Sequence, residues 1–141
     1  MPDNLAIERH CEKLSIAYAR AIDFNDHAAF ADLFAEDGVL NAGRELKGRD
    51  AIVKSLTRRP AELRSRQTNI FTEVISDTEA RGISYLSLYR HIGPASLEAT
   101  AIEFAGPAAV GHYDDQFVHT GDGWRFKQRQ LHMAFRRADA F

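Results

Sequence analysis

The sequence predicts an α+β domain in which N-terminal helices pack on one face of a curved antiparallel sheet. Apolar residues recur at helical spacing through the first 60 residues, whereas β-branched and aromatic residues gather in runs after Leu63. The chain has 141 residues, of which 45% are hydrophobic. This size fits a single domain over 1–141 whose core is large enough to hold one internal pocket.

Three helices are expected in the first 60 residues. The first has Asn4 as its N-cap and ends at Asp23, where turn-forming residues replace helix formers. A second, short helix is capped by Asp26, contains Phe34 and is closed by Gly38, and a third covers about 49–57. The apolar stripe of the first helix is Ile7, Cys11, Leu14, Tyr18 and Ile22.

Four or five antiparallel strands should follow these helices as a meander. The segment Thr120-Gly121-Asp122-Gly123 favours a hairpin turn, because glycine supplies the positive φ that tight turns need. The predicted strands are 68–75, 83–92, 99–104, 109–120 and 124–135.

Composition and charge exclude several classes of function. The 18 Lys and Arg residues against 20 Asp and Glu give a net charge of -2, which argues against nucleic acid or an anionic membrane as partner. Cys11 is the single cysteine and no secretory signal is recognised, so a cytoplasmic location is expected. The six histidines show no close metal-binding spacing, and no phosphate-binding loop is present, so neither a metal nor another cofactor is expected.

Several short segments, in this order and spacing, resemble one family. They are YARAIDFND (18–26), LFAEDG (33–38), GRDAI (48–52), GHYDDQF (111–117) and DGWRF (122–126) followed by Arg129. Together they resemble SnoaL-like proteins of the nuclear transport factor 2-like superfamily over nearly the whole chain. The resemblance implies a cone-shaped α+β barrel that encloses a pocket, and a homodimer.

The resemblance also implies catalytic groups at the end of the first helix. Dehydratase-like members have a Tyr and an Asp there, which Tyr18 and Asp23 match, and a strand histidine where this chain has Ser65. His112 and His91 are the candidates to replace that histidine. A carboxylate at a helix end is also a common cap, and a tyrosine on an apolar stripe is also a common core residue, so both interpretations of Tyr18 and Asp23 stay open.

Arg129 matches the arginine that the same members have near the C-terminus, where it is expected to orient the substrate. Strict alternation places Arg129 with Arg125 and Lys127 on a solvated face, opposite Trp124 and Phe126. A β-bulge would resolve this conflict.

The strand 109–120 presents two different faces, one of which should line the pocket. Tyr113, Asp115 and Phe117 form the more apolar set and are the better candidates for the interior. Adding residues of the neighbouring segments, the predicted substrate-binding residues are Asn69, Phe71, Tyr113, Asp115 and Phe34.

Three functions are compatible with this sequence. The first is a cofactor-independent lyase or isomerase of the dehydratase kind, acting on an apolar polycyclic, polyketide-like or aromatic substrate by Asp and Tyr acid–base chemistry. The second is a module that binds a small apolar molecule without catalysis, and the third is the small subunit of a ring-hydroxylating dioxygenase. A homodimer through the sheet is also expected, because strands 83–92 and 124–135 carry apolar residues on both faces.

Overall fold

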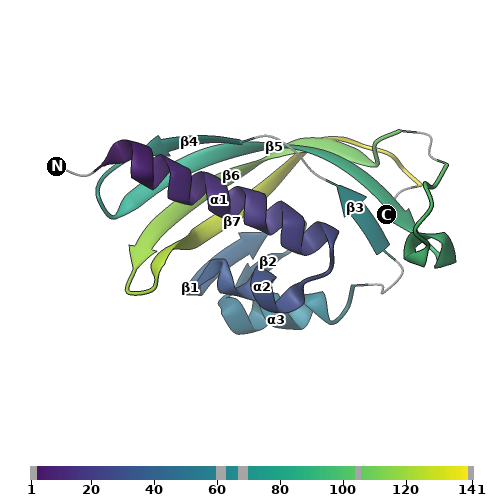
Figure 1. Cartoon of the computed structure of the whole chain (residues 1–141), viewed down its shortest axis with the longest axis horizontal. Helices are drawn as coiled ribbons and strands as arrows, with labels where there is room; N and C mark the ends of the chain where they lie inside the picture. Colours follow the sequence, from purple (N-terminus) through teal and green to yellow (C-terminus); the bar gives the residue numbers. More distant parts are fainter. Residues whose placement is uncertain (1–2, 60–62, 67–69, 104–105, 140–141) are drawn as a thin grey trace.

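Helices cover one face of a mixed β-sheet in the computed structural model (Figure 1). The structure describes residues 3–59, 63–66, 70–103 and 106–139. Its elements in chain order are α1 (Asn4–Asp23), α2 (His27–Asp32), β1 (Phe34–Asn41), β2 (Glu45–Lys47), α3 (Arg49–Leu56), β3 (Leu63–Arg66), β4 (Ile70–Val74), β5 (Glu79–Ile92), the 3-10 turn η1 (Pro94–Leu97), β6 (Ala109–Thr120) and β7 (Gly123–Arg136).

The predicted α+β class is confirmed, with the sheet open and mixed where a wholly antiparallel meander was expected. The strand order is β2-β1-β7-β6-β5-β3, and β4 pairs with a second part of the long strand β5. All these pairings are antiparallel except β1 with β7, which is parallel. β1 lies along the edge of β7 that faces away from β6, and it runs in the same direction as β7.

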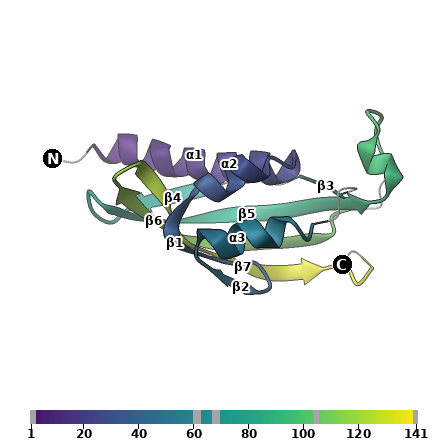
Figure 2. The ribbon, with the colours of Figure 1, turned by 90° about the horizontal axis from the view of Figure 1, so that it is seen from below.

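Figure 2 shows α1 and α2 lying over one face of the sheet, and the core lies between these helices and the sheet. The predicted stripe of α1 is buried in this core, together with aromatic residues of α2, β1 and β7 such as Phe30, Phe34 and Phe126. Arg49 joins α3 to this layer, because its Nη2 donates to the backbone oxygen of Phe34 at 2.6 Å. None of the described helices combines the length and apolarity that crossing a bilayer requires.

The helix boundaries agree with the sequence except at two places. Asp3 is the N-cap of α1 in place of Asn4, and its side chain accepts a hydrogen bond from the Ala6 amide. The segment from Phe34 to Gly38 was predicted as helix and is strand β1. Gly38 serves close strand packing, since a Cβ there would lie 2.9 Å from the Ala35 oxygen and 3.1 Å from the Phe126 oxygen.

Four of the predicted strands are present as β4, β5, β6 and β7. The strand predicted over 99–104 is wrong within its described part, because 99–103 follow η1 as bends and irregular chain. The chain leaves the sheet after Ile92, where Gly93 and Pro94 begin η1, and it is back beside β5 at Ala108, whose amide donates to the Leu88 oxygen.

The β-bulge expected near Arg129 is present in β7. Gln116 pairs with Gln128 and Phe117 pairs with Phe126, so Lys127 is the extra residue between two paired positions. One inserted residue reverses the alternation of every side chain beyond it. Arg129 therefore faces the interior, on the same side as Trp124 and Phe126.

The outer face of the sheet, opposite the helices, carries large apolar side chains. Phe71, Ile83, Tyr85 and Phe135 are 39–73% exposed, and they come from β4, β5 and β7. A patch of this kind is typical of a protein–protein contact. We therefore propose that two copies associate through this face.

A charge placed in this patch should separate the two copies. Tyr85→Asp is expected to give a monomer at micromolar concentration where the parent gives a dimer, because an unpaired carboxylate is costly to bury. Light scattering after size exclusion measures the mass. Leu5→Asp on the exposed start of α1 is the matched control and should stay dimeric. A monomeric parent would contradict this prediction.

Candidate active site

A cavity of about 480 Å³ lies between the helices and the inner face of the sheet. We call it the inner cavity. Most of its lining is apolar, and the polar side chains are two tyrosines, one serine and three arginines. The lining residues are Tyr18, Ile22, Phe30, Leu40, Ala42, Gly43, Arg44, Leu46, Ser55, Leu56, Arg59, Leu86, Leu88, Arg90, Tyr113, Leu131 and Met133.

Tyr18 and Tyr113 form a hydrogen-bonded pair at the wall of the inner cavity. The rings lie 5.5 Å apart, and each residue is at most 5% exposed. Burial raises the pKa of both phenols, while their mutual hydrogen bond lowers the pKa of Tyr18 and raises that of Tyr113. Both hydroxyls therefore stay protonated at neutral pH, and each can donate a hydrogen bond.

A buried ion pair packs against the rings of both tyrosines. Arg129 Nε donates to Asp115 Oδ1 at 2.7 Å, and Arg129 Nη2 donates to Asp115 Oδ2 at 3.0 Å. Ser84 completes the cluster, since its Oγ donates to Asp115 Oδ2 at 3.2 Å and accepts from Arg129 Nη2 at 3.0 Å. Burial lowers the pKa of Arg129, but the charge and hydrogen bonds of Asp115, together with Tyr18 and Tyr113, raise it overall.

The Arg129 guanidinium also packs against aromatic faces. Its Cζ lies 4.2 Å from the ring centroid of Tyr18 and 4.0 Å from that of Tyr113. Arg129 is itself 1% exposed and is absent from the lining of the inner cavity. Arg129 therefore acts on the cavity through the two tyrosines, because its positive charge lowers their pKa values.

Arg59 and Arg90 are two of the three arginines that bring positive charge to the inner cavity. Burial lowers the pKa of both Arg59 and Arg90, and the charge of Arg59 lowers that of Arg90 further. The Nε and Nη2 atoms of Arg59 are buried and have no hydrogen-bond acceptor among the described residues. The cavity therefore favours a ligand that carries an oxygen with negative charge or electron density.

Asp23 lies at the Arg59 end of this arrangement. It is half-buried at the last position of α1, and its charge raises the pKa of Arg59. Asp23 is absent from the described lining of the inner cavity, whereas Tyr18, five residues earlier, is part of it. Of the two groups predicted from the end of the first helix, Tyr18 lines the inner cavity and Asp23 lies outside its described lining.

Other predicted residues lie apart from the inner cavity. Phe34 is fully buried behind it and packs on the rings of Phe30 and Phe126. His91 is at the end of β5, where its Nδ1 lies 2.6 Å from Ser96 Oγ. Asn69 lies outside the described residues.

Phe71 and His112 are on the outer face of the sheet. Phe71 is 64% exposed, and His112 alternates with the buried residues Tyr113 and Gly111. The structure thus separates these two predicted site residues from the tyrosine pair. Tyr113 and Asp115 are on the inner face, as predicted for the more apolar set of this strand.

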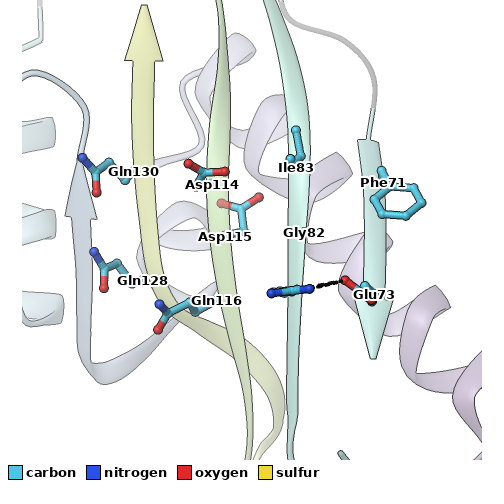
Figure 3. A pocket seen from close by; sticks show the side chains of 10 residues that line it. Phe71, Glu73, Gly82, Ile83, Asp114, Asp115, Gln116, Gln128 and Gln130 are labelled. Atoms are coloured by element: carbon cyan, nitrogen blue, oxygen red, sulfur yellow. Dashed lines mark hydrogen bonds and ion pairs between the residues drawn. The ribbon is translucent and has the colours of Figure 1, made fainter. Parts of the chain in front are cut away.

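Phe71 contributes to a second hollow of about 400 Å³, the outer groove (Figure 3). Its polar lining comes from glutamines of β6 and β7, from Asp114 and Asp115, and from the Arg81–Glu73 ion pair. A third hollow, of about 500 Å³, lies between α1 and the β6–β7 turn. Since the buried tyrosines belong to neither, the inner cavity is the candidate active site.

The described residues also hold one group suited to a metal ion, formed by His112, Asp114 and His132 on the outer face.

Sequence reasoning did not single out Arg59 or Arg90. Arg90 carries a usable signal, because it continues the inner alternation of Leu86 and Leu88 along β5. Arg59 follows the end of α3 in irregular chain, where no periodicity predicts which way a side chain points.

Removing one charge of the buried ion pair should destabilise the fold. Asp115→Asn leaves the Arg129 guanidinium buried without its counter-charge, and we expect a loss of about 3–5 kcal/mol in the free energy of unfolding. Urea unfolding followed by circular dichroism measures this loss. The double variant Asp115→Leu with Arg129→Met should recover much of it, because no unpaired charge remains. A loss below about 1 kcal/mol for Asp115→Asn would contradict a structural role.

Comparisons with solved structures show related folds across nearly the whole chain. A candidate scytalone dehydratase from Novosphingobium aromaticivorans is 25% identical, with 92% of this chain and 85% of that chain covered and a TM-score of 0.71. A protein of the same organism, described as NTF2-like with a cystatin-like fold, is 21% identical over 96% and 88%, with a TM-score of 0.74. A hexachlorocyclohexane dehydrochlorinase is 13% identical over 94% and 88%, with a TM-score of 0.75.

Among curated proteins, none matches the chain. The family comparison is decisive, because the sequence model of the SnoaL-like domain matches residues 3–130. The open, helix-covered sheet and the cystatin-like fold of the similar structures agree with it. The chain belongs to the SnoaL-like domain family.

Proposed function

We propose that this protein is a cofactor-independent lyase or isomerase that acts, in the inner cavity, on an apolar ring compound bearing a carbonyl oxygen. The observation that carries this proposal is the buried Tyr18–Tyr113 pair at the wall of a largely apolar cavity. The similarity to a candidate scytalone dehydratase supports the elimination of water as the kind of reaction.

In this proposal Tyr18 stabilises negative charge on the substrate oxygen. Burial raises the pKa of Tyr18, so its hydroxyl keeps the proton at neutral pH and can donate it in a hydrogen bond to the substrate. The guanidinium of Arg129, 4.2 Å from the Tyr18 ring centroid, makes the phenol a better donor by favouring its ionised form. A donor fixed before the substrate binds stabilises a developing oxyanion without reorganisation.

Asp23 is the proposed base. It removes a proton from the carbon next to the carbonyl, and the electron pair of that C–H bond moves to the carbonyl oxygen, which Tyr18 holds as an enolate. In an elimination, the enolate re-forms the carbonyl and expels a hydroxyl group from the adjacent carbon, while Asp23 returns its proton to that group. In an isomerisation, the proton returns to another carbon. Both sequences balance without an oxidant or reductant.

Arg59 and Arg90 are proposed to bind a second oxygen of the substrate, such as a phenolate or carboxylate. The buried Arg59 Nε and Nη2 atoms supply donors that the described residues leave without an acceptor. A guanidinium fork orients such a group, and a fixed orientation keeps the acidic C–H bond near Asp23.

Asp23→Asn should separate the catalytic role from a capping role. Asn keeps the size and a hydrogen bond but cannot accept the proton, so we expect turnover to fall by roughly 100-fold to 10,000-fold with little change in thermal midpoint. A panel of cyclic β-hydroxyketones, followed by absorbance of the enone product, measures turnover. Asp32→Asn, at the exposed end of α2, is the matched control. Equal turnover of parent and Asp23→Asn would rule out the base.

Tyr18→Phe tests the oxyanion donor. It removes one hydroxyl and keeps the ring that packs on Arg129, so we expect kcat to fall by about 100-fold or more while KM changes little, since the oxygen charge develops in the transition state. Steady-state kinetics on the same panel measures both constants. Ligand binding by the parent, with no turnover of any panel compound, would favour the non-catalytic binding module.

A further inference from the structure

Two histidines and one aspartate meet on the outer face of the sheet, away from the inner cavity. His112 and Asp114 lie two residues apart on β6, and His132 of β7 pairs directly with His112. The two imidazole rings stack with centroids 5.0 Å apart. One nitrogen of each histidine and one oxygen of Asp114 lie within 4.8 Å of one another.

The spacing of these atoms fits a single transition-metal ion. Asp114 Oδ2 is 2.9 Å from His132 Nε2 and 3.7 Å from His112 Nε2. Metal–ligand bonds of 2.0–2.2 Å in tetrahedral geometry separate neighbouring ligand atoms by about 3.4 Å, which lies between these two distances. Small side-chain rotations therefore suffice to place all three ligands around one ion.

Backbone geometry holds the two histidines in place. Residues in the middle of paired strands have fixed Cα positions, so binding does not require ordering of a loop. Gly111 assists this pairing, because the His132 carbonyl oxygen lies where a Cβ of any other residue would be. The site is therefore largely formed before the ion arrives.

The Asp114 carboxylate pairs with the two histidines. Among the described residues, the ion pairs of Asp114 are those with His112 and His132, and no lysine or arginine competes for it. The residues opposite Asp114 are neutral, Ile83 on β5 and Gln130 on β7, and Figure 3 shows Gln130 beside Asp114. A negative carboxylate between two imidazoles attracts a cation.

We propose that His112, Asp114 and His132 form a binding site for a divalent transition-metal ion of the Zn²⁺ type. Imidazole nitrogen and carboxylate oxygen suit Zn²⁺, Co²⁺, Ni²⁺ and Cu²⁺, whereas Mg²⁺ and Ca²⁺ prefer a shell of oxygen atoms. The three side chains are 38–54% exposed in the single chain, which leaves a coordination position open to water, and they lie beside Tyr85 and Ile83 of the proposed dimer face. This site is independent of the reaction proposed for the inner cavity.

Zn²⁺ titration of the chain without a polyhistidine tag tests the site. Competition with a chromophoric zinc chelator should show one Zn²⁺ per chain, and an excess of Mg²⁺ or Ca²⁺ should not displace it. In a two-dimensional NMR spectrum of the imidazole groups, Zn²⁺ should shift the signals of His112 and His132. Absence of binding, or one ion for every two chains, would overturn the three-ligand site.

Single substitutions locate the ion. His112→Ala, His132→Ala and Asp114→Ala should each weaken Zn²⁺ affinity by at least about tenfold, because loss of a direct ligand exceeds the effect of losing an outer-shell partner. His27→Ala, at the exposed start of α2, should bind as the parent does. Circular dichroism checks that each variant is folded. Two results would overturn the assignment. The first is an unchanged Zn²⁺ affinity in the folded His112 and His132 variants. The second is that these substitutions lower the stability of the protein while the parent binds no Zn²⁺.

Discussion

The ion pair between Arg129 and Asp115 is the contact on which the interior depends. A guanidinium and a carboxylate out of contact with water are costly to bury, and the cost is offset only when their hydrogen bonds are satisfied. Here two bonds join them directly, Ser84 completes the cluster, and the tyrosine rings cover the guanidinium face. The same rings form the cavity wall, so the cluster that stabilises the core also positions the phenols.

A single extra residue in β7 makes this arrangement feasible. Without the bulge at Lys127, Arg129 would face outward, and Asp115 of β6 would be buried without a counter-charge. The bulge lies between Phe126, whose ring packs in the core, and the polar cluster further along the strand. The bulge therefore places Phe126 and Arg129 on the same inner face, whereas regular alternation would place them on opposite faces.

The two faces of the sheet have different chemistry for the same geometric reason. Successive residues of a strand point to opposite sides, so Tyr113 and Asp115 belong to the interior while His112 and Asp114 belong to the exterior. The inner face supplies proton donors in an apolar surrounding, which suits the proposed proton transfers. The outer face supplies exposed apolar residues and metal-ligating groups, which suit association and cation binding.

The sequence by itself determined the α+β class, the first and third helices, four of the strands and the SnoaL-like family, because these follow from local periodicity and short motifs. It favoured the inward direction of Tyr113 and Asp115, and the tertiary structure decided it. It identified the conflict at Arg129, and the tertiary structure resolved that conflict through the bulge. Strand β1, the parallel pairing with β7, the buried Arg59 and the grouping of His112 with His132 were decided by tertiary structure alone. These features arise where segments far apart in the chain meet, and local spacing carries no information about which distant residues will lie opposite each other.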